Sequence, residues 1–258
     1  MPLALAYMRS LELLGARVLN GANVFALELS KSAQATLLRT LGIDCPRSIT
    51  FNDAARAAAL RAEIRWPALL KPDQGGSGAR IQVVDSSASR SKRSFARDPD
   101  VWLPDNLFLL QEYLPHDPER GIIRLEFLGG ELLYAMRVVT HGRFNLCPSP
   151  VCNPDDDSAG ACELPDRGAD ACAACRVLSV SEVPNDAVDT ARRIVARCED
   201  STSAASSTST PLDGRRVFYD INANSNLRPS VAAAFGFDPF ERVVDFLESQ
   251  LGQSGKSK

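Results

Sequence analysis

Histidine is scarce in this chain of 258 residues, which contains only His116 and His141. Neither of them belongs to a Ser/His/Asp arrangement of the kind used for nucleophilic catalysis. The formal net charge of −3 gives no basic field that would attract nucleic acid. A long apolar run is also missing, because Arg9 and Glu12 interrupt the apolar start of the chain well short of a membrane span. We therefore expect a cytoplasmic protein that binds neither nucleic acid nor a membrane.

The seven cysteines are too few to form a disulfide scaffold in a chain of this length, and five of them lie between Cys147 and Cys175. Cys172 and Cys175 have the spacing of a zinc-binding pair, which Cys147 and Cys152 could complete as a Zn²⁺ site. The acidic run 155–157 and the nearby glycines instead favour free thiols in a solvent-exposed insertion. Both interpretations stay open.

The pattern of apolar residues predicts strands that alternate with helices early in the chain and mostly antiparallel β-structure in its middle. The expected helices are 3–14, 30–41, 52–64, 184–198 and a last amphipathic helix that begins at Asp238 or Pro239. The expected strands are 17–20, 47–51, 67–71, 79–84, 107–114, 122–128, 131–139, a short one near Phe144, and 217–221. Gly129 and Gly130 predict a tight hairpin. The basic stretch 86–97 is expected to be an exposed loop or a frayed helix, and the Ser/Thr/Ala tract 202–210 is expected to be a mobile loop.

The strand that ends at Ile221 carries the most informative polar residues. Asp220 and Asn222 are two positions apart, so their oxygens lie on one face of the strand. Hard oxygen ligands of this kind suit Mg²⁺, which fills its remaining positions with phosphate and water. A plainer interpretation is a strand that ends in an Asn/Ser turn, since these residues are common in turns.

A second stretch runs from Lys71 into a glycine-rich turn made of Gly75, Gly76, Ser77 and Gly78. One ammonium group and several backbone N–H groups would suit a phosphate chain, and glycine allows a close backbone approach. The residue order differs from that of a P-loop, and the turn leads into a strand rather than a helix. Taken alone, the turn is also typical of an ordinary hairpin.

Two further groups are less specific. Gln111 and Glu112 end a hydrophobic strand, where they could present hydrogen-bonding groups to a purine or form only a polar rim. Arg124 and Glu126 share one strand face, which predicts an ion pair. Beside a phosphate site, Arg124 and Arg137 would instead neutralise a transferring phosphoryl group.

In their order along the chain, these residues resemble the ATP-grasp superfamily, and more narrowly its RimK-like ligase branch. The resemblance covers about residues 15–250, and the matching segments are Lys31, Lys71 with 75–78, 111–114, 123–124, 135–137 and 220–226. It implies an ATP-grasp fold, α+β or α/β in class, with ATP between two lobes. We expect a remnant of an N-terminal domain or a linker at 1–20 and a first lobe at 21–105. A second lobe is expected at 106–252, with the cysteine-rich insertion near 147–175, before a disordered tail at 253–258.

The resemblance also implies roles for single residues. The ligands of ATP would be Lys31, Lys71, Gly75, Gly76, Ser77, Gly78, Gln111, Glu112, Tyr113 and Leu114. The ligands of Mg²⁺, or of Mn²⁺ as an alternative ion, would be Asp220 and Asn222. The catalytic cations would be Arg124, Arg137 and Arg228, although Arg228 could equally be a surface residue.

The implied activity is an ATP- and Mg²⁺-dependent ligase that joins a carboxylate to an amine, or to another nucleophile, through an acylphosphate. Its substrates would be small-molecule or peptide acids and amines. Such a reaction depends on positioning and charge neutralisation more than on a protein nucleophile. The proposal requires Lys71 and Asp220 to line one cavity.

Three departures from the family pattern motivate an alternative. The second metal-binding carboxylate of the family would fall in 202–210, which has none, and most of the N-terminal domain is missing from this chain. Ile123 also takes the place of a usual acid. The alternative is a catalytically impaired ATP-binding protein that acts as a regulatory or partner subunit. A partner chain or a second copy could replace the missing domain. A zinc-stabilised interaction module is a third interpretation, which depends on the cysteines alone.

Overall fold

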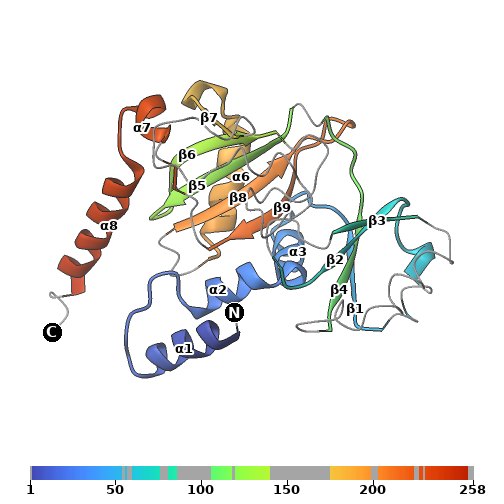
Figure 1. Cartoon of the computed structure of the whole chain (residues 1–258), viewed down its shortest axis with the longest axis horizontal. Coiled ribbons are helices and arrows are strands. Elements are labelled where there is room, and N and C mark those ends of the chain that lie inside the picture. Colours follow the sequence, from blue (N-terminus) through green and yellow to red (C-terminus); the bar gives the residue numbers. More distant parts are fainter. Residues whose placement is uncertain are drawn as a thin grey trace, which may run out of the picture.

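The computed structural model describes residues 2–53, 56, 60–75, 81–85, 106–117, 120–139, 175–198, 203–223, 227–228 and 230–254. Its strands form two sheets, shown in Figure 1. The first sheet has the spatial order β1 (Ser48–Phe51), β4 (Phe108–Glu112), β2 (Ala68–Pro72) and β3 (Gln82–Val84). The second has the order β7 (Cys175–Leu178), β6 (Glu131–Val138), β5 (Ile122–Leu128), β8 (Ser203–Ser209) and β9 (Val217–Asn222).

All strand pairings within these described ranges are antiparallel, which makes the fold α+β rather than α/β. Both β1 and β2 pair with β4, which comes from much later in the chain. The strand expected at 17–20 is wrong, because these residues form a loop and a turn in which Asn20 has a left-handed φ of 56°. Asparagine tolerates this conformation better than most residues, so the turn is locally acceptable.

Helices precede, connect and follow the strands of the two sheets. They are α1 (Pro2–Leu13), α2 (Ala22–Leu29), α3 (Lys31–Thr40), α6 (Asn185–Val195), α7 (Ser230–Phe235) and α8 (Pro239–Ser254), with 3₁₀ turns at Leu60–Ala62 and Val180–Glu182. The largest core lies between this sheet and α2, α3 and α6. The stripe predicted on α6 is confirmed, because Val188, Ala191, Ile194, Val195 and Cys198 are all buried. The opposite face carries a smaller cluster around Tyr134, Met136 and Val231, beside which polar residues of β5 and β9 are placed.

The prediction of a mobile loop at 202–210 is wrong, because residues 203–209 form β8. This strand pairs with β5 on one side and β9 on the other. Its Ser, Thr and Ala residues lack the apolar alternation by which strands are identified in a sequence. The two neighbouring strands supply backbone hydrogen bonds on both sides and bury Ser206, Ser207 and Thr208, so tertiary pairing overrides a weak local preference.

The hairpin predicted at Gly129 and Gly130 is confirmed. These two residues join β5 to β6 with Leu128 paired to Glu131, and their φ angles are 58° and 86°. Two positive φ angles in a two-residue loop are typical of a type I′ turn. A Cβ atom on Gly129 would lie 2.6 Å from Cε2 of Phe246, whereas a Cβ on Gly130 would meet nothing within 4 Å. Gly129 therefore serves both the turn and the contact with α8.

We expect Gly129→Ala to lower the free energy of unfolding by about 2–4 kcal/mol, since a left-handed backbone and a steric overlap each cost about 1–2 kcal/mol or more. Gly130→Ala is the matched control, with a left-handed φ but open space, and should cost only about 1–2 kcal/mol. Urea denaturation of the two variants measures the difference. Equal losses would show that the contact between Gly129 and Phe246 does not matter.

The last helix is present as predicted, but its apolar stripe is not buried. Helix α8 begins at Pro239, and Asp238 Oδ1 accepts a hydrogen bond of 2.8 Å from the Phe240 N–H. The side chains of Phe240, Val244, Leu247 and Leu251 are between 39% and 76% exposed. The periodicity of apolar residues therefore predicted the helix correctly, but it did not predict that the apolar face of the helix would stay exposed. None of the described helices is long and apolar enough to cross a membrane.

Several predictions fall outside the described residues and stay predictions. They are most of the helix 52–64, the turn residues 76–78, the loop 86–97, the strand near Phe144, and three of the four proposed zinc ligands, Cys147, Cys152 and Cys172.

Candidate functional site

The site is built around the end of β9, which lies at the edge of the five-stranded sheet. Asn222 Nδ2 donates a hydrogen bond of 2.8 Å to Asp220 Oδ2, so the two side chains meet on one face. Ser207 pairs with Asp220 and Thr208 with Phe218, which leaves Tyr219 as the extra residue of a β-bulge. A bulge re-aims the side chains on either side of it. Here Phe218 enters the main core while Asp220 stays on the opposite, polar face.

A buried glutamine holds β9 from the side of α3. Gln34 is 2% exposed, and its Nε2 donates to the Ile221 carbonyl at 2.9 Å while its Oε1 accepts from the Ile221 N–H at 3.1 Å. Because β9 is an edge strand, Ile221 has a neighbouring strand on only one side. The side chain of Gln34 bonds to both its N–H and its carbonyl on the other side. The sequence analysis missed Gln34. Its only signal was its place four residues before the apolar Leu38, on the inward face of the helix.

Two more side chains hold the residue after Asn222. Glu28 Oε2 accepts from the Ala223 N–H at 2.9 Å, and Asn20 Nδ2 donates to the Ala223 carbonyl at 2.6 Å. The backbone is therefore fixed on both sides of Asn222. These contacts orient Asn222 and the nearby Asp220. They come from a turn and from helix α2, which the sequence pattern of β9 does not indicate.

We expect Gln34→Leu to lower the free energy of unfolding by about 2–4 kcal/mol, because it leaves the buried N–H and carbonyl of Ile221 without partners. The amide hydrogen of Ile221 should also exchange faster with solvent. Thr36→Ala is the matched control, since Thr36 is on the exposed side of the same helix and its hydroxyl bonds only within that helix, to the Ser32 carbonyl and the Arg39 guanidinium. Denaturation and hydrogen exchange measure both effects. A loss no larger than that of the control, with an unchanged Ile221 amide, would contradict the clamp.

On the same face of the sheet, Arg124 of β5 is aligned with Ser207 of β8 and Asp220 of β9. The predicted ion pair is confirmed, because Arg124 Nε donates to Glu126 Oε1 at 2.6 Å and Glu126 is fully buried. Burial alone would lower the pKa of Arg124, but the charges of Glu126 and Asp220 outweigh it and raise the pKa above its usual value. The guanidinium therefore stays charged and acts on Asp220 across the small side chain of Ser207.

Lys71, in β2 of the other sheet, faces this group. Its side chain is buried, and its Nζ lies 6.0 Å from the centre of the Tyr219 ring. Burial and, after it, the charge of Lys31 lower the pKa of Lys71 from 10.5 to about 8, although Asp220 acts in the opposite direction. Lys71 also lines one cavity with Tyr219, the residue next to Asp220. The two sheets therefore bring Lys71 and Asp220 to the same site.

The glycine-rich turn begins against the first turn of α3. Lys31 Nζ donates to the Gly75 carbonyl at 2.7 Å. The buried carboxylate of Asp73 accepts from the Ser32 N–H at 2.7 Å, which is favourable because the N-terminus of a helix carries partial positive charge. These contacts place the start of the turn beside Lys31 and close to Lys71.

Residues of β4 complete the cavity. The side chain of Gln111 lines it together with Lys31 and Lys71, and Gln111 Nε2 donates to Ser48 Oγ at 3.0 Å. After Glu112 the chain leaves the first sheet, and the segment 113–115 leads to a bridge between His116 and Pro211 beside the second sheet. Tyr113 and Leu114 thus lie in the connection between the two sheets.

Of the other two predicted arginines, Arg137 is not brought together with Arg124. Arg137 pairs with Ile123, whose side chain enters the main core, so Arg137 lies on the opposite face from Arg124. It donates to the Arg120 carbonyl at 2.6 Å. Arg228 precedes α7, and its buried Nε has no hydrogen-bond partner within the described part of the chain.

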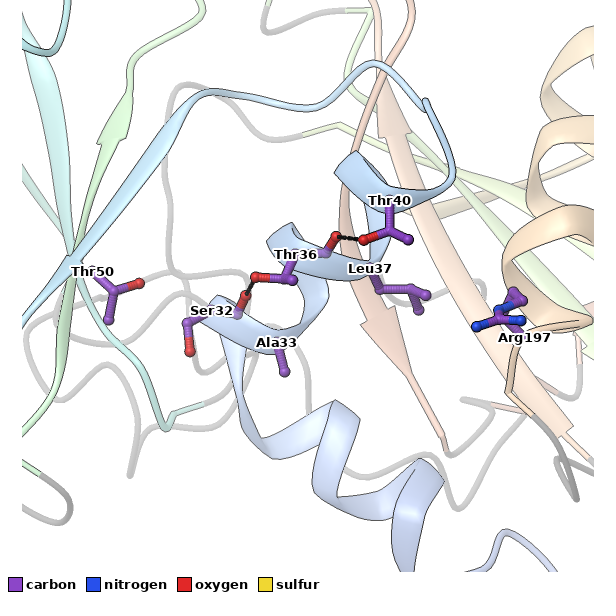
Figure 2. A pocket seen from close by; sticks show the side chains of 7 residues that line it. All are labelled: Ser32, Ala33, Thr36, Leu37, Thr40, Thr50 and Arg197. Atoms are coloured by element: carbon purple, nitrogen blue, oxygen red, sulfur yellow. Dashed lines mark hydrogen bonds between the residues drawn. The ribbon is translucent and has the colours of Figure 1, made fainter.

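A second hollow lies on the other side of α3, between Thr50 of β1 and Arg197 after α6, as Figure 2 shows. Thr36 and Thr40 line it, but their hydroxyls donate to carbonyls of their own helix, both at 2.9 Å. Arg197 is the one charged residue in its lining. The hollow is open and shallow and brings no set of charged groups together, so we place the candidate site at Lys71 and Asp220 instead.

The donor chemistry of the site fits Mg²⁺. Asp220 offers carboxylate oxygens, and a half-turn of the Asn222 carboxamide would present its oxygen in place of the nitrogen that now faces Asp220. Mg²⁺ commonly takes one or two protein oxygens and completes its shell with phosphate and water. Over the described ranges, no group of three or more His, Cys, Asp or Glu is placed to hold a metal ion.

Comparisons with known proteins give matches in structure only. No family model matches the sequence, and no curated protein matches it. The ATP-grasp ligase PsnB, in complex with a minimal precursor, is similar with a TM-score of 0.61 and 22% identity over 97% of this chain and 69% of that chain. The D-cycloserine synthetase DcsG is similar with a TM-score of 0.68 and 15% identity over 96% and 78%.

A RimK domain ATP-grasp protein from Sphaerobacter thermophilus is similar with a TM-score of 0.58 and 18% identity over 90% of this chain and 72% of that chain. At identities this low, the likeness concerns the fold. This likeness agrees with the two antiparallel sheets of the chain, which meet at a cavity lined by Lys31 and Lys71. We conclude that the chain is ATP-grasp-like, with an α+β architecture shared with ATP-grasp ligases.

Proposed function

We propose that this protein is an ATP- and Mg²⁺-dependent ligase that activates a carboxylate as an acylphosphate and transfers the acyl group to an amine or another nucleophile. The observation that carries the proposal is that Lys31 and Lys71 line one cavity together with Tyr219, the residue next to Asp220, and that the charge of Asp220 acts on Lys71. Cations beside a carboxylate are the arrangement needed to bind a polyphosphate and a divalent ion side by side. The similar ligases, which include structures with Mg and ADP, support the same nucleotide and ion here.

In this proposal, Lys31, Lys71 and the turn 75–78 bind the ATP phosphates. Gln111 and the segment 112–114 lie where a purine would cross between the sheets. Asp220 and Asn222 hold the ion, which when bound neutralises charge on the phosphates. Arg124 stays charged and stabilises the phosphoryl group in transfer, because its pairing with Glu126 holds the guanidinium on the face that Asp220 occupies.

The reaction needs no protein nucleophile. A carboxylate oxygen of the substrate attacks the γ-phosphorus, the bond to the β-γ bridging oxygen breaks, and ADP leaves with the electron pair. The amine then attacks the acyl carbon, phosphate leaves, and the amine gives up a proton as the amide forms. Arg228 is our candidate for the substrate carboxylate or the acylphosphate, since its buried Nε is an unused donor among the described residues. The task of the protein is to position and to neutralise charge.

Hydroxylamine trapping tests the proposed function. The protein is incubated with ATP, Mg²⁺, hydroxylamine and a panel of amino acids and short peptides, and hydroxamate, ADP and AMP are quantified. We expect hydroxamate and ADP in equal amounts with at least one acid, and no AMP. Formation of AMP would point to an acyl-adenylate and contradict the acylphosphate route. Asp220→Asn serves as the inactive control.

A catalytically impaired ATP-binding protein remains the second candidate, because Ser207 and not a carboxylate faces Asp220. Stoichiometric ATP binding without ADP release over the whole panel would favour it. For the ligase, we further propose the RimK-like branch, supported by the motif order and by the similar RimK domain protein. PsnB has been solved with a precursor peptide, so peptide carboxylates belong in the panel together with small acids.

A further inference from the structure

We propose that the site binds the polyphosphate of the nucleotide without a divalent ion, and admits the ion only together with the nucleotide. This inference rests on the nucleotide site of the proposed function, and it concerns the order and interdependence of the two ligands. It follows from the side chains of β8 and from the balance of charge around Asp220.

The first observation is that β8 contributes no carboxylate to the polar face. Ser207 is the direct partner of Asp220, and Ala205 is the direct partner of Asn222. Side chains of directly paired residues on one face lie about 4.5–5.5 Å apart at Cβ, which is the separation at which two carboxylates can share one ion. Here the partner positions carry only a hydroxyl and a methyl group. Within the described residues, Asp220 and Asn222 are therefore offered as oxygen donors, and β8 adds no second carboxylate beside them.

The second observation is that the charged residues that line the cavity are both cations, Lys31 and Lys71. Of the described carboxylates nearby, Glu126 is paired with Arg124 at 2.6 Å, and Asp73 accepts a hydrogen bond from the N-terminus of α3. At Lys71 the influence of Lys31 is larger than that of Asp220. Such a site attracts a polyanion. It repels a free divalent cation, whose charge would meet two ammonium groups before any phosphate is present.

The properties of Mg²⁺ lead to the same conclusion. The ion loses its water reluctantly and binds weakly to a single carboxylate. Phosphate oxygens of the nucleotide would provide the remaining negative charge and ligands. The nucleotide is therefore needed for the ion, whereas the ion is not needed for the nucleotide.

Calorimetric titration of the full chain tests the proposal directly. AMPPNP is titrated in EDTA and then in excess Mg²⁺, and MgCl₂ is titrated alone. We expect the dissociation constant for AMPPNP in EDTA to lie within about tenfold of that in Mg²⁺, since the two lysines of the cavity provide most of the attraction. We also expect that Mg²⁺ alone shows no saturable binding to the protein, even at about ten times the Mg²⁺ concentration that saturates the complex with AMPPNP.

The variant Ser207→Asp should reverse this behaviour. A carboxylate at this position would face Asp220, so we expect AMPPNP binding in EDTA to weaken by about tenfold or more and to recover in Mg²⁺. Mg²⁺ alone should raise the melting temperature of this variant but not that of the wild type. Ser207→Asn is the matched control, with nearly the same shape and no charge, and should respond to Mg²⁺ as the wild type does.

The outcomes separate this inference from the proposed function. Saturable binding of Mg²⁺ alone to the wild type, or AMPPNP binding detectable only with Mg²⁺, would overturn the inference while leaving the nucleotide site intact. Absence of AMPPNP binding in both conditions would overturn the nucleotide site itself. If Ser207→Asp does not fold, the wild-type titrations decide the question on their own.

Discussion

Lys71→Ala is expected to weaken ATP binding by about 30- to 100-fold at pH 7, which corresponds to about 2–3 kcal/mol for the loss of a buried cation from a phosphate. Lys71 is buried at the cavity and lies over the Tyr219 ring, so water cannot readily replace its ammonium group. The loss should appear in the dissociation constant measured with AMPPNP. Thr36→Ala, on the exposed side of α3, should leave this constant unchanged.

The same lysine predicts a pH dependence. Burial, and then Lys31, hold the pKa of Lys71 at about 8, so the ammonium form predominates below pH 8 and is lost as the pH rises above it. Since the polyphosphate binds the charged form, we expect the affinity of the wild type to fall by up to about tenfold per pH unit above pH 8. Binding above pH 8 should also take up close to one proton, which titrations in buffers of different ionisation enthalpy measure.

Lys71→Arg provides the control for this pH profile. Arginine stays protonated over the whole range, so the variant should bind with an affinity that no longer falls between pH 8 and 9. A steep fall that persists in Lys71→Arg would show that another group titrates, and would contradict the assignment to Lys71.

Asp220→Asn is expected to lower ligase turnover by about 1000-fold or more while AMPPNP still binds, because the variant loses the one carboxylate that holds the ion and keeps the cations that hold the phosphates. Removal of the negative charge near Lys71 should leave metal-free binding unchanged or slightly stronger. Hydroxamate formation measures the turnover, and calorimetry measures the binding. The contrast with Lys71→Ala, which affects binding first, separates the two roles.

Asp213→Asn is a suitable control for Asp220→Asn. Asp213 lies in the exposed β8–β9 connection and pairs with Arg215 at 2.9 Å, away from the cavity. We expect its removal to change neither turnover nor binding. Equal and negligible effects of Asp213→Asn and Asp220→Asn would contradict the metal role of Asp220.

The parts of the fold that the sequence predicted are those with local chemical causes. Ser30 accepts a hydrogen bond of 3.1 Å from the Ala33 N–H and begins α3, as its capping preference indicated. Gly129 and Gly130 form the tight turn because positive φ angles are accessible to glycine. The pairing of Arg124 with Glu126 and the shared face of Asp220 and Asn222 follow from the period of two along a strand.

The parts that the sequence did not predict depend on contacts between distant segments. Residues 203–209 have no strand pattern of their own and become β8 because β5 and β9 lie on either side. Gln34 is 187 positions from Ile221, and nothing in either segment indicates that they meet. Arg137 looked equivalent to Arg124, but its pairing with Ile123 turns it to the opposite face.

By itself, then, the sequence determined which side chains are available for phosphate and metal chemistry and which strand faces carry them, because strand period, capping and glycine turns act over a few residues. Only the tertiary structure decided that Lys71 lines a cavity with Tyr219, next to Asp220, and that Ser207 stands opposite Asp220. Long-range strand pairing sets these positions, and its register depends on burial and backbone hydrogen bonds of the whole sheet rather than on any local pattern.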